Sequence, residues 1–180
     1  MPDESYWNTF FDPLAVLKDF GLQEDTDLIV DVGSGYGTFA IPAASYIKGK
    51  VIGLDIEKDM VDICKTKANN LGIENTDFLQ TDVFTEGMCL PIGSVDCVFL
   101  FNILHCEKPL DLLNKTYSSL KKGGKVFVMH WIFDINTPRG PSMDIRPKPE
   151  QIIDLASQTN FTYLKQIDIK PYHYGLILEK

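Results

Sequence analysis

Polar side chains recur where five apolar segments of this 180-residue chain end. The residues at these ends are Asp31, Asp55, Asp82, Asn102 with His105, and His130 with Trp131. A carboxylate in such a place can accept hydrogen bonds from the hydroxyls of a ribose, and a histidine can carry a proton. The pattern therefore favours a site for a nucleoside cofactor, with a histidine close to the reacting group.

The run IVDVGSGYG, at residues 29–37, is the most informative motif in the chain. Its glycines Gly33, Gly35 and Gly37 allow a turn that brings bare backbone close to a ligand. A helix is expected to begin at about Gly37, so that free N–H groups at its start would face a polar ligand group. Asp55 follows Gly35 by 20 residues, which is the spacing at which an acid holds a ribose diol.

Five strands must lie side by side to bring these residues to one edge. Apolar runs predict strands at 28–32, 50–55, 77–82, 95–101 and 125–133. Apolar residues at helical spacing predict helices at 37–47, 57–71, 109–121 and 151–159. This alternation implies a parallel sheet with helices on both faces, and segments 161–169 and 172–179 add an antiparallel hairpin. The predicted fold class is α/β: a doubly wound, mostly parallel seven-stranded sheet with a C-terminal antiparallel hairpin.

The 180 residues are expected to form one domain in three parts. Residues 1–24 include a helical segment that begins after Asp12 and would lie across the ligand edge of the sheet as a cover. Residues 25–133 form the part that binds the cofactor. Residues 134–180 start with a polar, proline-rich loop at 134–148. This loop is long enough to serve a function, and we expect it on the side where the molecule that reacts with the cofactor binds.

Composition narrows the possible partners. The net charge of −8 argues against nucleic acid and against an anionic membrane surface. The lysines at 121, 122 and 125, beside two glycines, are interpreted as the end of the preceding helix rather than as a phosphate site. No apolar run reaches the length of a membrane helix, and no secretory leader is visible, so a cytoplasmic protein is expected. The four cysteines form no CxxC pair, and no metal site is expected.

The glycine motif argues against two common classes of nucleoside cofactor. A dinucleotide fold places a small residue where this chain has Thr38, and no triphosphate-binding GxxxxGK[ST] motif is present. Instead, the segment 28–133 resembles the class I S-adenosylmethionine-dependent methyltransferases, and FNILHCEKP is similar to the branch of quinone-biosynthesis and small-molecule enzymes. The resemblance implies a Rossmann-like fold, S-adenosylmethionine as the cofactor, and a cofactor site made of Asp31, Gly33, Ser34, Gly35, Gly37, Asp55, Ile56, Asp82, Val83 and Asn102.

The family's cofactor carries its methyl group on a positively charged sulfur, so the enzyme mainly has to hold a nucleophile in line with that bond. His105 is the candidate base, and the alternative is that it caps a helix or bonds to the backbone. His130 is a second catalytic candidate, unless it faces the core. Tyr6, Trp7 and Trp131 could form aromatic walls at the acceptor or pack in the core. Arg139 and Arg146 could grip an acidic acceptor, or be solvated at the surface.

The leading hypothesis is a methyltransferase acting on a small-molecule acceptor, as a monomer or homodimer. Three alternatives stay open. The acceptor could be a protein side chain, or the chain could be a non-catalytic S-adenosylmethionine-binding module or subunit. A nicotinamide-dependent oxidoreductase is the third, although Thr38 and the lack of a Tyr-x-x-x-Lys motif argue against it.

Overall fold

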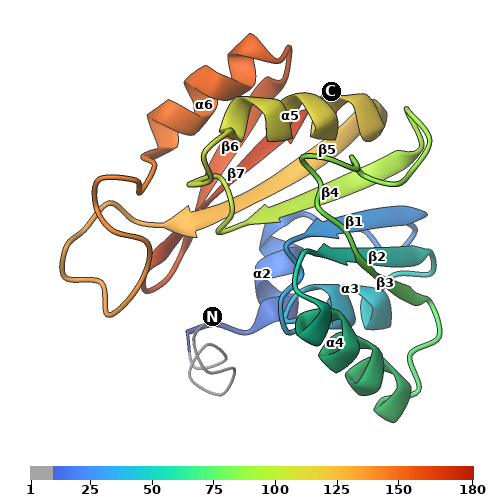
Figure 1. The fold of residues 1–180 in the computed structure, drawn as a ribbon. Coiled ribbons are helices and arrows are strands. Elements are labelled where there is room, and N and C mark those ends of the chain that lie inside the picture. Colours follow the sequence, from blue (N-terminus) through green and yellow to red (C-terminus); the bar gives the residue numbers. More distant parts are fainter. Residues whose placement is uncertain (1–9) are drawn as a thin grey trace.

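The computed structural model describes residues 10–180 of the chain (Figure 1). Its helices are α2 (Pro13–Phe20), α3 (Ala40–Tyr46), α4 (Lys58–Asn70), α5 (Pro109–Ser119) and α6 (Pro149–Gln158). Its strands are β1 (Leu28–Val32), β2 (Lys50–Asp55), β3 (Thr76–Gln80), β4 (Val95–Phe101), β5 (Leu120–Trp131), β6 (Thr162–Ile169) and β7 (His173–Glu179).

The strands form one seven-stranded sheet in the order β3-β2-β1-β4-β5-β7-β6. The first five strands in this order pair in parallel, and β7 runs antiparallel between β5 and β6. The predicted fold class, with its C-terminal antiparallel hairpin, is therefore confirmed. The chain reverses its direction of winding between β1 and β4, which is where folds of this kind bind ligands.

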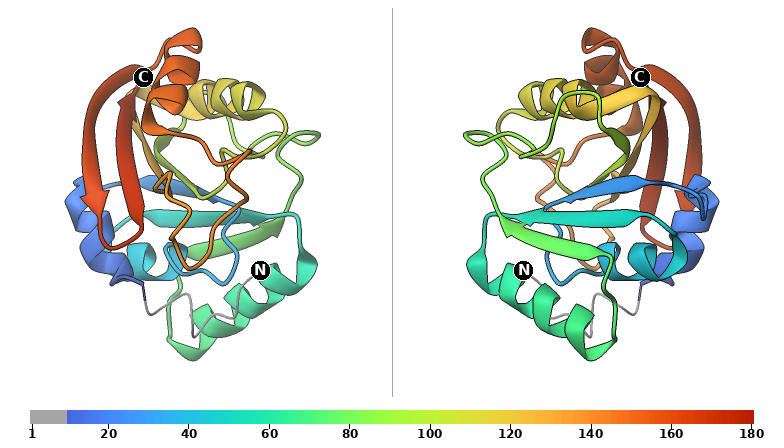
Figure 2. Two further views of the ribbon diagram at one scale, coloured as in Figure 1. Left: turned by 90° about the vertical axis from the view of Figure 1, so that its left-hand side faces the viewer. Right: turned by 90° about the vertical axis from the view of Figure 1, so that its right-hand side faces the viewer.

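Helices cover both faces of the sheet, as the parallel pairing requires. Helices α2, α3 and α4 lie on one face, and α5 and α6 lie on the other (Figures 1 and 2). Because successive strand residues point to opposite faces, Ile29 joins the core under α3 while Val30 joins the core under α5. The same alternation divides Val98 from Phe99 in β4. The central strands are thus buried on both sides, and polar residues are confined to their ends.

Helix α2, which precedes β1, packs on a face of the sheet. Asp12 caps α2 as predicted, since its Oδ1 accepts hydrogen bonds from the backbone N–H groups of the next turn. Leu17 and Phe20 on α2 are buried beside α3 and β6. Their burial places α2 on the face of the sheet that also carries α3 and α4, and the cover proposed for residues 1–24 stays a prediction. Ahead of α2, the ring of Phe10 meets the ring of Trp131 edge-on with 5.5 Å between centroids, and the ring of Phe11 lies 5.4 Å from that of Phe39.

Two predicted boundaries are wrong, both at glycines. The predicted helix at 109–121 ends at Ser119, and the glycine pair at 123–124 lies inside β5 instead of ending a helix. Pairing of Leu120 with Val95 draws this segment into the sheet, and Lys121 forms an ion pair with Asp96. The helix predicted from Gly37 begins only at Ala40 and has seven residues.

Residues 132–148 connect β5 to α6 without a helix or strand, as predicted for the loop at 134–148. This loop lies at the same edge of the sheet as the glycine turn (Figure 2). Among residues 10–180, no helix is both long and apolar enough to cross a bilayer.

Candidate active site

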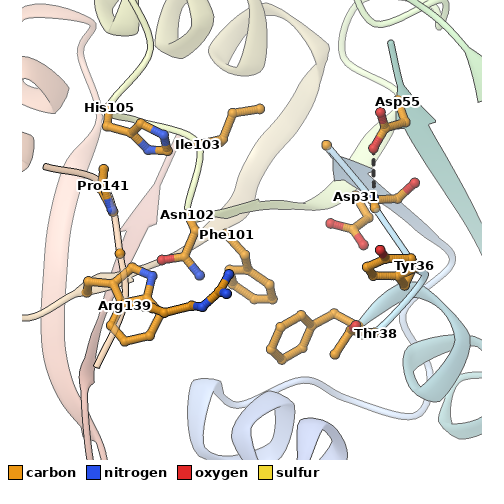
Figure 3. A pocket seen from close by; sticks show the side chains of 16 residues that line it. Asp31, Tyr36, Thr38, Asp55, Phe101, Asn102, Ile103, His105, Arg139 and Pro141 are labelled. Carbon is orange, nitrogen blue, oxygen red and sulfur yellow. Dashed lines mark hydrogen bonds between the residues drawn. The ribbon is translucent and has the colours of Figure 1, made fainter. Parts of the chain in front are cut away.

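A cavity of about 680 Å³ opens at the carboxyl ends of the parallel strands (Figure 3). The turn after β1, the end of β2, the end of β4 and the loop after β5 all contribute to its wall. The residues that line it are Asp31, Gly33, Ser34, Gly35, Tyr36, Thr38, Phe39, Asp55, Phe101, Asn102, Ile103, His105, Trp131, Arg139, Gly140 and Pro141. The structure therefore brings most of the predicted site residues into one pocket.

Two carboxylates stand on one side of this pocket. Asp31 is the fourth residue of β1 and Asp55 is the last residue of β2, so neighbouring parallel strands bring them together. Burial, and then the charge of Asp55, raise the pKa of Asp31 to about 7. The site thus holds an acid that is only part ionised near neutral pH and that a bound cation would convert to its charged form.

Asp55 holds the glycine turn in shape. Its Oδ2 accepts a hydrogen bond from the N–H of Gly35 at 2.8 Å, and its Oδ1 accepts one from the N–H of Glu57 at 3.0 Å. The N–H groups of Gly33 and Ser34 both bond to the carbonyl of Leu54. The N–H of Gly37 donates to the carbonyl of Ser34.

These bonds use N–H groups of the turn, and the expectation that free N–H groups at the start of the helix face a ligand stays a prediction. The N–H groups of Gly33, Ser34, Gly35 and Gly37 are all used inside the turn, and the short helix α3 begins three residues beyond it. The N–H groups of these four residues are therefore already bonded within the protein.

Asn102 presents an amide that needs a partner. It follows β4 directly and adopts a left-handed backbone with φ of 53°, a conformation that Asn tolerates better than most residues. Both polar atoms of its side chain are buried, and neither has a hydrogen-bond partner within residues 10–180. The Oγ of Ser34 is in the same condition. Buried amides rarely stay unpaired, so the amide marks a place for a polar ligand group.

The two catalytic candidates are in contact. Nδ1 of His105, in the turn after β4, lies 3.3 Å from Nε2 of His130, near the end of β5. His130 is fully buried, and burial lowers its pKa to about 3, with a smaller effect from His105. Burial also lowers the pKa of His105, which lines the pocket while His130 does not. His105 can therefore touch a ligand, and His130 stays neutral behind it.

The opposite wall of the pocket comes from the loop after β5. Arg139 extends its side chain into the cavity, and Trp131 and Pro141 also line it (Figure 3). Arg146 differs from the prediction that it grips an acceptor. Arg146 is 6% exposed, and within residues 10–180 its guanidinium donates to the loop itself, to carbonyl oxygens and the hydroxyl of Thr137.

Four predicted cofactor residues lie outside the lining of this cavity: Gly37, Ile56, Asp82 and Val83. Ile56 is 60% exposed next to Asp55, and Val83 is buried in the core under α5. Asp82 is half-buried two residues after β3, where its Oδ1 accepts a hydrogen bond from the N–H of Phe84. Their assignment to the cofactor stays a prediction. Tyr6 and Trp7 lie outside the described residues.

Sequence reasoning missed several lining residues, because their types carry no chemistry of their own. Tyr36 and Thr38 belong to the glycine turn, and Phe101 precedes Asn102, so their places in the motifs could have indicated them. Gly140 and Pro141 carried no such indication, since nothing local shows that the loop folds back on the pocket.

The family model described as "Methyltransferase domain" matches residues 29–124, which are 96 of the 180 residues. The matched segment runs from β1, through the glycine turn and Asn102, into β5. The chain belongs to this family, and its resemblance to class I S-adenosylmethionine-dependent methyltransferases is confirmed.

Similar proteins agree with this assignment. Over 121 residues the chain is 34% identical to the carboxy-S-adenosyl-L-methionine synthase of Nautilia profundicola, covering 64% of this chain and 48% of that protein. It is also 34% identical over 97 residues to a demethylmenaquinone methyltransferase of Lactococcus lactis, covering 52% of this chain and 37% of that protein. The chain thus spans less than half the length of these relatives. A solved S-adenosylmethionine-dependent methyltransferase from Aquifex aeolicus superimposes with a TM-score of 0.87 at 25% identity, covering 98% of this chain and 93% of that one.

Proposed function

We propose that this chain is an S-adenosylmethionine-dependent methyltransferase that transfers a methyl group to a small-molecule acceptor by in-line displacement. The observation that carries the proposal is the unpaired amide of Asn102, which faces Asp31 and Asp55 across one cavity at the switch point of the sheet. Acceptors of hydrogen bonds on one side and an unpaired amide on the other suit a ligand that has hydroxyl, ammonium and carboxylate groups.

The residues around the glycine turn fit this cofactor. A Cβ atom at Gly33 would lie 3.1 Å from Ile103, and one at Gly37 would lie 2.8 Å from Ile41, so the close course of the backbone depends on both glycines. We assign Asp55 to the ribose hydroxyls and Asp31 to the ammonium group of the cofactor. We assign Asn102 to its polar amino-acid tail. When bound, S-adenosylmethionine supplies a methyl group made electrophilic by the positively charged sulfur.

The chain's own task is then to place and prepare the acceptor. His105 lines the pocket on the side away from the acids, and its depressed pKa keeps it neutral and able to take a proton at neutral pH. We propose it as the base for an acceptor that starts protonated. Arg139 is proposed to bind an anionic group of the acceptor.

Calorimetric titration tests the proposal. S-adenosylhomocysteine should bind to the wild-type protein, and NAD should not. Binding of NAD alone would contradict the proposal and favour an oxidoreductase. Methyl transfer is then measured with radiolabelled S-adenosylmethionine and a fractionated host extract. Label found only in protein would favour a side-chain methyltransferase, and cofactor binding without transfer would favour a non-catalytic module.

We further propose a cytoplasmic protein that acts as a monomer or homodimer without nucleic acid. Its four thiols form no disulfide, as is usual in a reducing compartment, and its net charge is −8. The division into a cofactor part at 25–133 and an acceptor part at 134–180 is likewise a proposal, supported by the origin of the two walls of the pocket.

A further inference from the structure

Arg146 is the most heavily bonded side chain in the loop after β5. Its guanidinium makes six donor–acceptor contacts between 2.7 and 3.3 Å with five N–H groups, so at least one N–H is shared between two acceptors. The acceptors are the carbonyl oxygens of Ile132, Asp134, Arg139 and Pro141 and the hydroxyl of Thr137. Each of the three nitrogens of the guanidinium donates, and all five acceptors belong to residues 132–141, a ten-residue stretch of one loop. One buried cation thus gathers the whole turn around itself.

Gly140 shows how tightly this loop is closed. It has a φ of 120°, and a Cβ atom there would lie 2.6 Å from Nη2 of Arg146 and 3.0 Å from Cγ of Trp131. The guanidinium of Arg146 and the indole of Trp131 therefore both occupy the space into which a Cβ at Gly140 would point. A side chain at this position would have to push one of them away.

The closed loop forms one wall of the pocket. Arg139, Gly140 and Pro141 line the cavity, and Arg139 and Pro141 lie on the side opposite Asp31 and Asp55 (Figure 3). Among the described lining residues, both carboxylates stand at the glycine turn, and the guanidinium stands at the loop. Arg146 has no place in the lining, so it acts on the pocket through the loop.

We propose that Arg146 is a positioning residue that fixes residues 132–141 as a preformed wall, on which Arg139 receives an acceptor carrying an anionic group. This inference rests on the proposed function and deepens it, because it gives the chemical class of the acceptor. It separates two duties within one loop: Arg146 shapes the wall, and Arg139 meets the ligand.

Arg146→Lys is the main test. Lysine keeps the positive charge but offers one ammonium group, which cannot satisfy five acceptors spread around a planar fork. In the variant, trypsin should cleave the Arg139–Gly140 bond at least about tenfold faster, and amide hydrogen exchange over residues 133–146 should accelerate. The substitution adds no cleavage site of its own, because Pro147 follows. Affinity for S-adenosylhomocysteine should stay within about twofold of the wild type.

Benzoate and its neutral counterpart benzamide probe the acceptor side, with both added to protein saturated with S-adenosylhomocysteine. The wild type should bind benzoate more tightly than benzamide in ligand-observed NMR, and Arg146→Lys should lose about fivefold or more of this preference. Equal binding of the two probes by the wild type would overturn the anionic class. An unchanged preference in Arg146→Lys, unchanged protection of the loop, or a parallel loss of S-adenosylhomocysteine affinity would overturn the positioning role.

Gly140→Ala disturbs the same contact without changing Arg146. It keeps the proposal testable if Arg146→Lys does not fold. It should reproduce the faster cleavage and the lost preference for benzoate. Gly72→Ala is the matched control, because Gly72 also has positive φ but a Cβ there would meet nothing within 4 Å. That control should leave the loop unchanged, and an equal effect in both alanine variants would overturn the role given to the contact with Arg146. A wild type that fails to bind S-adenosylhomocysteine would contradict the proposed function instead, while the cleavage contrast would stand.

Discussion

The carboxylate of Asp55 accepts a hydrogen bond from the backbone N–H of Gly35 at 2.8 Å. The acid at the end of β2 thus supports the turn after β1 directly. Because Asp55 also lines the pocket, one side chain links the shape of the turn to the binding of a ligand. Its removal should therefore disturb the turn as well as the ligand.

Asp55→Ala should abolish the thermal stabilisation that S-adenosylhomocysteine gives to the wild type. The variant loses the acceptor for the ribose and leaves the N–H of Gly35 without its partner, at a cost of about 1–3 kcal/mol in the free energy of unfolding. Differential scanning fluorimetry with and without the compound measures both effects. Asp77→Ala, at a half-exposed ion pair, is the control and should keep the stabilisation. Full stabilisation of Asp55→Ala would refute the assignment.

Asn102→Gly should separate binding from folding. Glycine accepts the left-handed backbone without strain but removes the amide, so the melting temperature should be preserved while affinity for S-adenosylhomocysteine falls about tenfold. Asn160 has a similar φ of 63° and does not line the cavity, which makes Asn160→Gly the matched control. Calorimetry on the two variants decides the question. If Asn102→Gly and Asn160→Gly bind S-adenosylhomocysteine with equal affinity, the amide of Asn102 does not contact the cofactor.

Affinity for the cofactor product should rise with pH around neutrality. The pKa of Asp31 is about 7, and a bound ammonium group favours the carboxylate, so binding should weaken as pH falls below 7 and level off above it. Calorimetric titrations between pH 6 and 8.5 follow this dependence. Asp31→Asn should remove the part of the dependence due to this group, and a profile identical to that of the wild type would contradict the role of Asp31.

The same acid should limit stability. Its pKa is higher in the folded chain than in the unfolded one, so its contribution to the free energy of unfolding falls as pH rises from about 4 to about 7. Asp31→Asn should therefore be more stable than the wild type at pH 8, by about 1–3 kcal/mol, because the buried side chain at position 31 then carries no charge. Urea denaturation at pH 5 and pH 8 measures the difference, which should shrink at the lower pH. A gain of the same size at both pH values would be inconsistent with titration of Asp31.

His130 should make the fold sensitive to acid. Its pKa is lowered to about 3 in the folded chain, so its contribution to stability is complete above its unfolded pKa of about 6.5 and is lost as pH falls below that value. His130→Gln should flatten the fall in the free energy of unfolding between pH 6 and 4 by about 1.4 kcal/mol per pH unit. Denaturation curves for both proteins over this range test the slope, and parallel curves would show that His130 does not titrate in this way.

His105→Ala should slow methyl transfer by about 100-fold or more while S-adenosylhomocysteine affinity stays nearly intact, if the acceptor needs a base. His105 lines the acceptor side, so its loss should not disturb the acids that hold the cofactor. The rate is measured with radiolabelled cofactor and the small-molecule fraction of a host extract. Unchanged turnover would remove His105 as the base.

Much of the fold was predictable because its strands are nearly continuous apolar runs. The continuous apolar run Val95–Phe101 predicted a strand buried on both faces, and Asp31 and Asp55 stand at or next to the last residue of such strands. Parallel pairing then placed Asp31 beside Asp55 without further information. The places of these acids and of Asn102 in the pocket therefore followed from local patterns and one rule of topology.

The acceptor side could not be predicted in this way. Arg146 was interpreted by its type, as a charge available to a ligand, because its acceptors are carbonyl oxygens that a sequence does not display. The contact between His105 and His130 depends on the parallel pairing of β4 with β5 and on the turn after β4, and neither histidine indicates it alone. The glycines beside Lys122 were assigned to a helix end because glycine in β5 resembles a stop signal.

The two walls of the pocket descend from different stretches of the chain. The acids and the glycine turn lie between Asp31 and Asp55, whereas the opposing loop begins after Trp131 and is tied mainly to itself through Arg146. Residues 132–148 can therefore change in sequence without disturbing the acids and the glycine turn between Asp31 and Asp55. Chimaeras that exchange residues 132–148 between relatives should keep their cofactor affinity and change their acceptor specificity.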